Sequence, residues 1–109
     1  MLKLTNPRAK KEHIFKFYNN EKECGSFHIV NKLQCKEIWC FGIHDPQDRG
    51  VGLGQQMLNE CLDMLSGNTI ELGCLKDNYR ALHIYHKFGF IIVEDCGEYY
   101  WMRREASQS

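Results

Sequence analysis

The sequence predicts an α/β domain built on a mixed β-sheet. Three observations support this fold class: strand patterns joined by short turns open the chain, a strand–helix–strand unit occupies its middle, and two further strand patterns form a hairpin near the C-terminus. A strand–helix–strand unit requires a right-handed crossover that makes its two strands parallel, whereas a hairpin is antiparallel. The predicted sheet therefore contains both strand directions.

Three antiparallel strands are expected first, at residues 13–19, 26–31 and 37–43, where aromatic and β-branched residues recur. Polar residues and a glycine at 20–25 predict the turn between the first two strands. The preceding residues 1–12 contain Pro7 and four basic side chains, and they show no amphipathic pattern. We expect them to form a flexible basic arm outside the fold rather than a binding patch.

Two helices are expected in the second half of the chain. Apolar residues recur at helical spacing over residues 52–65, and Gly67 follows as a residue that ends a helix. A second apolar stripe runs over residues 78–88, with Asp77 or Asn78 as its N-cap and a glycine at its end. Between the helices, residues 69–75 read as a strand that runs parallel to residues 37–43.

A C-terminal hairpin is expected from strands at residues 90–94 and 98–103 around a turn at 95–97. The chain has 109 residues, of which 43% are apolar and 26% charged, and this is enough for one hydrophobic core. The sequence contains no repeat and no low-complexity linker. We therefore expect one domain over residues 13–104, followed by a polar tail at 105–109.

A glycine-rich segment precedes the first predicted helix. It consists of Arg49, Gly50, Val51, Gly52, Leu53 and Gly54. The first backbone N–H groups of a helix lack partners inside it, and the helix dipole places partial positive charge at the same end, so a bound diphosphate satisfies both. The glycine spacing matches neither the dinucleotide fingerprint nor the P-loop. By itself the segment fits a phosphate cradle and a plain strand-to-helix turn equally well.

A second motif lies on the second predicted helix and makes the assignment more specific. Together the two motifs comprise Arg49, Gly52 and Gly54 in one segment and Asn78, Ala81, Tyr85, Gly89 and Phe90 in the other. In this order, with a helix and a strand pattern between them, they resemble the two motifs of the GNAT superfamily of acyl-CoA-dependent N-acyltransferases. The resemblance covers the chain from about residue 38 to residue 103.

The resemblance implies a GNAT-like mixed sheet whose two parallel strands splay apart at their carboxyl ends. Coenzyme A would enter that gap, where main-chain groups of Phe41, Gly42 and Ile43 contact its pantetheine arm and residues 49–54 hold its diphosphate. Asn78 would bind the cofactor as well as cap its helix. The implied function is an N-acetyltransferase that moves an acetyl group from acetyl-CoA to a primary amine by direct attack in a ternary complex.

Catalytic candidates follow from what acyl transfer to an amine needs. A main-chain N–H at a bulge near Gly42 is the expected oxyanion donor. The leaving thiolate, whose thiol has a pKa near ~8.5, gains from a proton donor, and by resemblance Tyr85 is the candidate. Family members often carry a glutamate base five residues before the motif asparagine, where this chain has Gly73. Glu71 and His44 are the candidate bases, and each also has an ordinary interpretation as a solvated surface residue.

The resemblance is incomplete at the front of the chain. A typical GNAT domain begins with a strand and two helices that build much of the acceptor site, whereas about a dozen residues precede the first predicted strand here. Both a minimal domain with an open cleft and a homodimer whose second copy completes the acceptor site fit the sequence. The missing front also leaves a second function open, a non-catalytic coenzyme A-binding sensor or interaction module.

Charge and cysteine content narrow the range of partners. Lys and Arg total 14 and Asp and Glu total 14, so the net charge gives no support for a nucleic-acid partner. The chain has no stretch long enough to cross a bilayer, and its six cysteines lack the spacing of a metal site. We expect a cytoplasmic protein with reduced thiols, an amine acceptor that is a small molecule or a peptide, and no membrane or metal partner.

Overall fold

The structure, a computed structural model, describes residues 2–9, 12–48 and 52–106 of the chain, with only the backbone described before residue 13. Its elements are β1 (Leu2–Ala9), β2 (Glu12–Asn19), β3 (Lys22–Asn31), β4 (Lys36–Ile43), a 3-10 helix (Pro46–Asp48), α1 (Leu53–Met64), β5 (Ile70–Leu75), α2 (Tyr79–Lys87), β6 (Ile91–Asp95) and β7 (Tyr99–Arg104). The predicted helices and the C-terminal hairpin are confirmed, with bounds that each differ from prediction by one residue.

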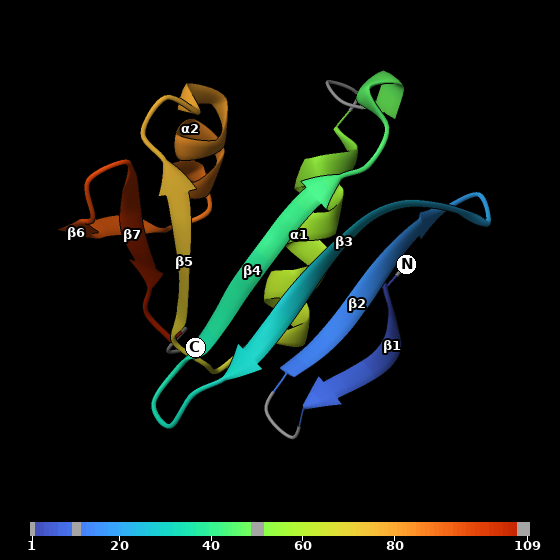
Figure 1. Cartoon of the computed structure of the whole chain (residues 1–109), viewed down its shortest axis with the longest axis horizontal. Helices are drawn as coiled ribbons and strands as arrows, with labels where there is room; N and C mark the ends of the chain where they lie inside the picture. Colours follow the sequence, from blue (N-terminus) through green and yellow to red (C-terminus); the bar gives the residue numbers. More distant parts are fainter. Residues whose placement is uncertain (1, 10–11, 49–51, 107–109) are drawn as a thin grey trace.

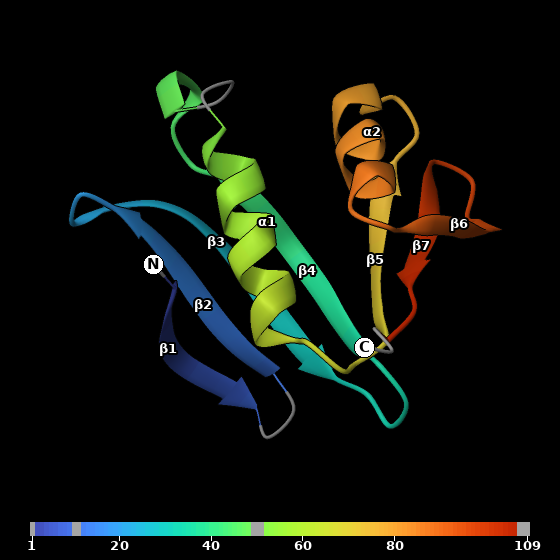
Figure 2. The ribbon, with the colours of Figure 1, turned by 180° about the vertical axis from the view of Figure 1, so that it is seen from behind.

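The strands form one mixed sheet in the order β1-β2-β3-β4-β5-β7-β6. Of the strand pairs in the described residues, β4 and β5 run parallel and the other pairs run antiparallel. Both helices lie on the same side of the sheet: the sheet is in front of them in Figure 1, and they are in front of it in Figure 2. The predicted α/β fold class with a mixed sheet is therefore confirmed.

The N-terminal prediction needs correction, because residues 2–9 form the edge strand β1, paired antiparallel with β2. A flexible arm was expected here because of the basic residues and Pro7. Leu2 and Leu4 alternate with polar residues at the period of a strand. The register of the pair shifts between Thr5 and Ala9, around Pro7, and proline is tolerated on an edge strand or at a bulge because its missing N–H is not needed there.

The turn between β2 and β3 is also shorter than predicted. Asn20 and Glu21 alone make it, with φ angles of 52° and 67°, the two positive values that a two-residue hairpin turn of type I′ requires. Residues 22–25, which were expected to belong to this turn, are part of β3. Gly25 is a glycine because a Cβ there would lie 2.9 Å from both the Gly42 carbonyl oxygen and the Met57 sulfur.

The hydrophobic core lies between the sheet and α1. Helix α1 buries Leu53, Met57, Leu58, Cys61 and Leu62. From the sheet, the side chains buried in the same core include Phe27, Ile29, Ile38, Ile70, Leu72 and Met102. Full burial of a side chain of this size stabilises the fold by about 1.5–3 kcal/mol, so this one-sided packing fixes the position of α1 on β3 and β4.

The strands β4 and β5 pair only at their first residues. The register joins Lys36 to Ile70, Glu37 to Glu71 and Ile38 to Leu72, and beyond this point the two strands diverge, as Figure 1 shows. A bulge lies in β4 just after the last paired residue: the β3–β4 register shifts between Ser26 and His28, and Cys40 has a φ of 55°. The splay expected from the family resemblance is present, but the bulge falls at Cys40 rather than near Gly42.

Candidate active site

A cavity of about 230 Å³ opens on the helix side of the sheet, at the diverging ends of β4 and β5. Three elements build it. Its lining consists of Phe41, Gly42 and Ile43 from β4, Gly52, Gly54, Gln55 and Leu58 from the start of α1, and Asn78, Arg80, Ala81, Ile84 and Tyr85 from the start of α2. The two sequence motifs, which are separated by a helix and a strand in the chain, therefore meet at one cavity.

The N-terminus of α1 borders this cavity with exposed backbone. Gly52 is the N-cap, with a φ of 87° and no side-chain hydrogen bond to the helix. The first helical bond described at this end is donated by the Gln56 N–H to the Gly52 carbonyl, so the preceding N–H groups have no partner inside the helix. The predicted cradle residues Arg49, Gly50 and Val51 lie outside the described residues.

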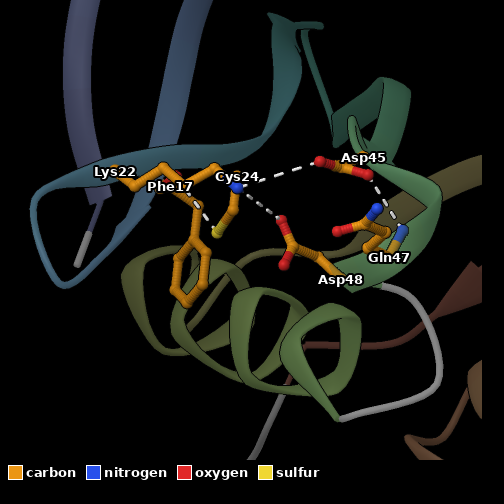
Figure 3. A network of polar contacts seen from close by, with 6 residues as sticks. All are labelled: Phe17, Lys22, Cys24, Asp45, Gln47 and Asp48. Atoms are coloured by element: carbon orange, nitrogen blue, oxygen red, sulfur yellow. Dashed lines mark hydrogen bonds and ion pairs between the residues drawn. The ribbon is translucent and has the colours of Figure 1, made fainter.

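The segment that leads into α1 is tied to the β2–β3 hairpin (Figure 3). Lys22 Nζ lies 3.8 Å from Asp45 Oδ2 and 3.5 Å from Asp48 Oδ2, and the Gln47 N–H donates to Asp45 Oδ1 at 2.9 Å. Ion pairs this exposed contribute little to stability. Their geometric effect is to attach the 3-10 helix to the sheet just before the glycine-rich segment, on the side away from β5.

Asn78 occupies the N-cap of α2, as predicted. Its side-chain oxygen accepts a hydrogen bond from the Ala81 N–H at 3.2 Å, and the residue lines the helix-side cavity. An N-cap of this kind is worth about 1 kcal/mol to the helix. The side-chain amide N–H₂ is not used by this bond, so Asn78 can cap its helix and still donate toward the cavity.

Tyr85 lies at the junction of two cavities. Its ring packs edge-on against Phe41, with centroids 6.4 Å apart, and against Phe90, with centroids 5.7 Å apart. Burial raises the pKa of Tyr85 well above its usual range, with smaller contributions from Cys74 and Cys61. The phenol is therefore protonated throughout the neutral pH range and is able to donate a proton or a hydrogen bond.

A second cavity, of about 350 Å³, opens on the opposite side of the sheet. Phe41 and Tyr85 line it as well as the helix-side cavity. The rest of its lining is apolar or aromatic and consists of Ile38, Trp39, Cys40, Leu72, Gly73, Leu75 and Tyr99. Among the described residues that line either cavity there is no carboxylate and no imidazole. A ligand that spans the β4–β5 gap would therefore meet Phe41 and Tyr85 from both sides.

Gly73 stands where a family glutamate was looked for, and its neighbours explain the glycine. Gly73 pairs with Trp101 on β7. A Cβ at Gly73 would lie 3.2 Å from the Tyr99 ring and 3.5 Å from two carbons of the Trp101 ring. The two aromatic rings thus cover the backbone at this position, and a glutamate side chain here would displace them.

Neither predicted base lines the two cavities. Glu71 lies at the paired end of β4 and β5, where its carboxylate accepts hydrogen bonds from Trp101 Nε1 at 2.6 Å and from Arg103 Nε at 2.9 Å. Burial alone would raise the pKa of Glu71, but these hydrogen bonds and the charge of Arg103 outweigh it, so the pKa is lowered. His44 is exposed at the end of β4, with Nε2 3.1 Å from Glu23 Oε2.

Trp39 and Arg80 were not singled out from the sequence as site residues. Arg80 lines the helix-side cavity and Trp39 the opposite one, whereas Trp101 packs against Trp39. For the tryptophans a signal existed: the alternation of a strand places residues 37 and 39, and likewise 101 and 103, on one face.

All six cysteines are free thiols, and they differ in burial. Cys24, Cys61 and Cys74 are buried, and burial raises the pKa of each, that of Cys61 to about 12. Cys35 Sγ lies within 4.8 Å of Glu37 and Glu71 carboxylate oxygens. Because Trp39, Trp101 and Arg103 already donate to those carboxylates, this cluster is bound by protein donors.

The fold and the site define an α/β protein with a splayed parallel strand pair, a glycine-capped helix at the gap and an aromatic-lined opening behind it. The family model described as acetyltransferase (GNAT) domain matches residues 10–92. The chain therefore belongs to the GNAT acetyltransferase family. Comparison with curated proteins gives no significant match.

Solved structures share this fold. A PaiA N-acetyltransferase from Thermoplasma acidophilum in complex with coenzyme A is similar with a TM-score of 0.74 at 14% identity, covering 87% of this chain and 61% of its own. The PseH N-acetyltransferase from Campylobacter jejuni in complex with acetyl coenzyme A gives a TM-score of 0.70 at 23% identity, covering 92% and 72%. The chain thus spans about three fifths of the length of the first of these.

None of the helices in the described parts of the chain is long and apolar enough to cross a membrane.

Proposed function

We propose that this protein is an N-acetyltransferase that binds acetyl-CoA at the helix-side cavity and transfers its acetyl group to a primary amine that approaches from the opposite side. The observation that carries the proposal is the convergence at one gap of the α1 N-terminus, the Asn78 N-cap and Tyr85. Solved relatives of the same fold hold coenzyme A or acetyl coenzyme A, which supports the choice of co-substrate.

The residues present fit coenzyme A. The α1 N-terminus offers unpaired N–H groups beside Gly52, where no Cβ holds an anion away from the backbone, and this suits the diphosphate. The register between β4 and β5 ends at Ile38, so the main-chain groups of residues 41–43, which lie beyond it, suit the amides of a pantetheine arm. Asn78 adds a side-chain donor at the same cavity. We keep Arg49, Gly50, Val51, Leu53 and Gly54 as proposed diphosphate residues.

Acetyl-CoA supplies an activated acyl group as a thioester when bound. Tyr85 is proposed to donate a proton to the departing sulfur, because its side chain lines both cavities. A main-chain N–H of residues 41–43, next to the Cys40 bulge, is proposed to stabilise charge on the acyl oxygen. The amine attacks directly, so the acetyl group passes from sulfur to nitrogen while both substrates are bound.

The mechanism also calls for a proton acceptor for the amine. Glu71 is the better of the two predicted candidates, because it shares a strand face with Gly73, which lines the far cavity. A water chain would have to link its carboxylate to the amine, and the lowered pKa makes it a weak base. His44 contacts Glu23 of β3, on the side of β4 away from β5. An amine that arrives neutral from solution needs neither residue, because the proton that its nitrogen loses as the amide forms returns to Tyr85, which has given its own proton to the departing sulfur.

The lack of a base in the described linings of the two cavities favours a second candidate function, a non-catalytic coenzyme A-binding module. The described linings of both cavities lack a carboxylate and an imidazole, and no described helix covers the far face of the sheet. Such a module would bind the cofactor without turnover. We propose the enzyme first because Tyr85, which binding alone does not need, lies at the gap. A cytoplasmic location and a homodimer that completes the acceptor side remain proposals.

The test is thiol release from acetyl-CoA in the presence of an amine panel that includes polyamines, amino sugars, aminoglycosides and peptide N-termini. The enzyme predicts amine-dependent release that falls about a hundredfold in Tyr85→Phe. The binding module predicts saturable coenzyme A binding with no release for any amine. Absence of both coenzyme A binding and release would overturn both functions.

A further inference from the structure

The face of the sheet opposite the helices carries an aromatic surface that crosses three strands. Register and alternation place Trp39 of β4, Leu75 of β5, and Tyr99 and Trp101 of β7 on this face. Trp39 is 45% exposed, Tyr99 38% and Leu75 55%. No helix within the described ranges lies over them, since both helices are on the other side in Figures 1 and 2. These large side chains are therefore open to a ligand.

Two tryptophan–glutamate pairs stand side by side on this surface. Trp39 Nε1 donates to Glu37 Oε1 at 2.9 Å, and Trp101 Nε1 donates to Glu71 Oε1 at 2.6 Å. The two indole rings contact each other, with centroids 5.7 Å apart and planes at 46°. Glu37 and Glu71 are register partners across the parallel pair, and each has a carboxylate oxygen within 4.8 Å of the other's. The four side chains form one fixed unit.

This unit has the electrostatics of a cation site. The faces of an indole carry negative potential, which attracts an ammonium group placed over the ring. A carboxylate that accepts from the indole N–H adds electron density to that ring, and it fixes the ring orientation. Arg103 balances one of the two carboxylates. The two carboxylates and Arg103 together therefore leave one negative charge beside the indole rings, and this charge favours a cationic ligand over a neutral apolar one.

The aromatic surface borders the cavity through which an acceptor would reach the gap between β4 and β5. Trp39 and Tyr99 line the cavity on the far side of the sheet, and Phe41 and Tyr85 line both this cavity and the helix-side cavity. An amine that attacks a thioester must be uncharged. A charged ammonium held over the indoles is therefore a different nitrogen from the one that reacts at Tyr85.

We propose that Trp39, supported by Trp101, Glu37 and Glu71, binds an alkylammonium group of the acceptor, so that the acceptor is an amine that carries a second positive charge. The role of this ligand as an acetyl acceptor rests on the proposed acetyltransferase function. The cation site itself does not, because it is built from residues that make no contact with the helix-side cavity. Its occupancy is measurable without turnover.

Binding is tested with choline and its neutral carbon isostere, 3,3-dimethylbutan-1-ol, on the full chain at pH 8. The chain has two tryptophans, so two indole N–H signals report in NMR spectra. We expect choline to shift both signals saturably and to bind about tenfold more tightly than the isostere. Equal affinity for the two probes, or choline shifts confined to backbone amides far from Trp39, would overturn the proposal.

Two variants of Trp39 distinguish the effect of its aromatic ring from the effect of its apolar volume. Trp39→Leu keeps an apolar side chain at a half-exposed position and is expected to lose the preference for choline, whereas Trp39→Phe keeps an aromatic face and should retain most of it. A Trp39→Leu protein with normal choline affinity contradicts the assignment. Circular dichroism and the indole signal of Trp101 show whether each variant is folded. If Trp39→Leu does not fold, the two-probe comparison on the unaltered chain decides.

A kinetic experiment extends the test to the acceptor. 1,5-Diaminopentane and pentylamine have the same chain length and differ by one amino group. We expect kcat/KM for the diamine to exceed that for pentylamine about tenfold, well above the statistical factor of about two, with most of the gain in KM. Trp39→Leu should abolish the gain, so that kcat/KM for the diamine exceeds that for pentylamine only by the statistical factor. Turnover that is equal for both amines contradicts the proposal, and choline binding without any turnover contradicts the proposed function alone.

Discussion

The two ends of the β4–β5 pair differ in almost every physical respect. At the closed end, Ile38 and Leu72 are buried against the core, and Glu71 is tied to Arg103 and Trp101. At the open end, the strands share no register, Cys40 has a positive φ, and two cavities meet at Phe41 and Tyr85. One strand pair thus supplies both a packed anchor and an open gap.

The difference shows how a small chain combines stability with an open site. Unpaired backbone costs free energy unless water or a ligand satisfies it, so a splayed pair needs a well-packed neighbour to hold it. Here the packing lies a few residues away along the same two strands. Substitutions at the closed end should therefore act on stability, and substitutions at the open end on binding and rate.

The largest effect is expected from Leu72→Ala at the closed end. Leu72 is 2% exposed in the core, and a truncation of this kind costs about 2–5 kcal/mol of unfolding free energy. Urea unfolding followed by circular dichroism measures the loss. Coenzyme A affinity of the folded fraction should change little. A variant as stable as the parent chain would show that the anchor lies elsewhere.

Tyr85→Phe at the open end is expected to lower kcat about a hundredfold, equivalent to ~2.7 kcal/mol of barrier. Phenylalanine keeps the edge-on packing against Phe41 and Phe90, so stability and coenzyme A affinity should stay close to those of the parent. Thiol-release kinetics beside calorimetric binding separate the two quantities. A fall in affinity equal to the fall in rate would make Tyr85 a packing residue and not a proton donor.

Alanine substitutions at the two glycines at the start of α1 are expected to change the stability of the ligand-free chain in opposite directions. Gly52→Ala places a Cβ at a φ of 87° and should cost roughly 1–2 kcal/mol of stability, although nothing lies within 4 Å of that Cβ. Gly54→Ala lies inside the helix, meets only Ile43 at 3.8 Å, and should stabilise the ligand-free chain by about 0.5–1 kcal/mol.

Both variants are expected to bind coenzyme A more weakly, because each adds a Cβ between the backbone and the proposed diphosphate. Thermal unfolding with and without coenzyme A measures stability and affinity in the same samples. Unchanged coenzyme A stabilisation in Gly54→Ala would mean that the diphosphate does not approach the helix N-terminus.

The smallest effect is expected from Glu71→Gln, and it depends on pH. The pKa of Glu71 is lowered in the folded chain, so its ion pair stabilises the fold above the unfolded pKa of about 4.3 and the contribution is lost as pH falls below it. The parent chain should therefore be more stable than Glu71→Gln at pH 7, and the difference should shrink toward pH 3. A difference that grows on acidification would contradict this sign.

Much of the fold could be predicted from the sequence because its signals are local. Helical spacing and flanking glycines placed α1 and α2, and the strand–helix–strand pattern gave the parallel pair. The misses have local causes too. β1 carries Pro7 among basic residues, and the two-residue turn at Asn20 and Glu21 lacks the glycine that usually marks positive φ.

The candidate site was predictable only where a motif marked it. Asn78 and Tyr85 were found through the spacing of the second motif, and both line the cavity. The Trp39–Trp101 contact joins residues 62 positions apart, and it depends on the order of β4, β5 and β7 in the sheet. Sequence periodicity gives the face of a strand but not its neighbour, so this surface required the structure.

The central claim is that acyl-CoA enters the open end of the β4–β5 pair and meets the N-terminus of α1. Backbone amide NMR spectra recorded during a coenzyme A titration test it most directly. The account predicts saturable shifts that are largest at residues 41–43 and 53–55 and small at residues 36–38 and 70–72. Shifts that are largest at the closed end, or no saturable shift at millimolar coenzyme A, would contradict it.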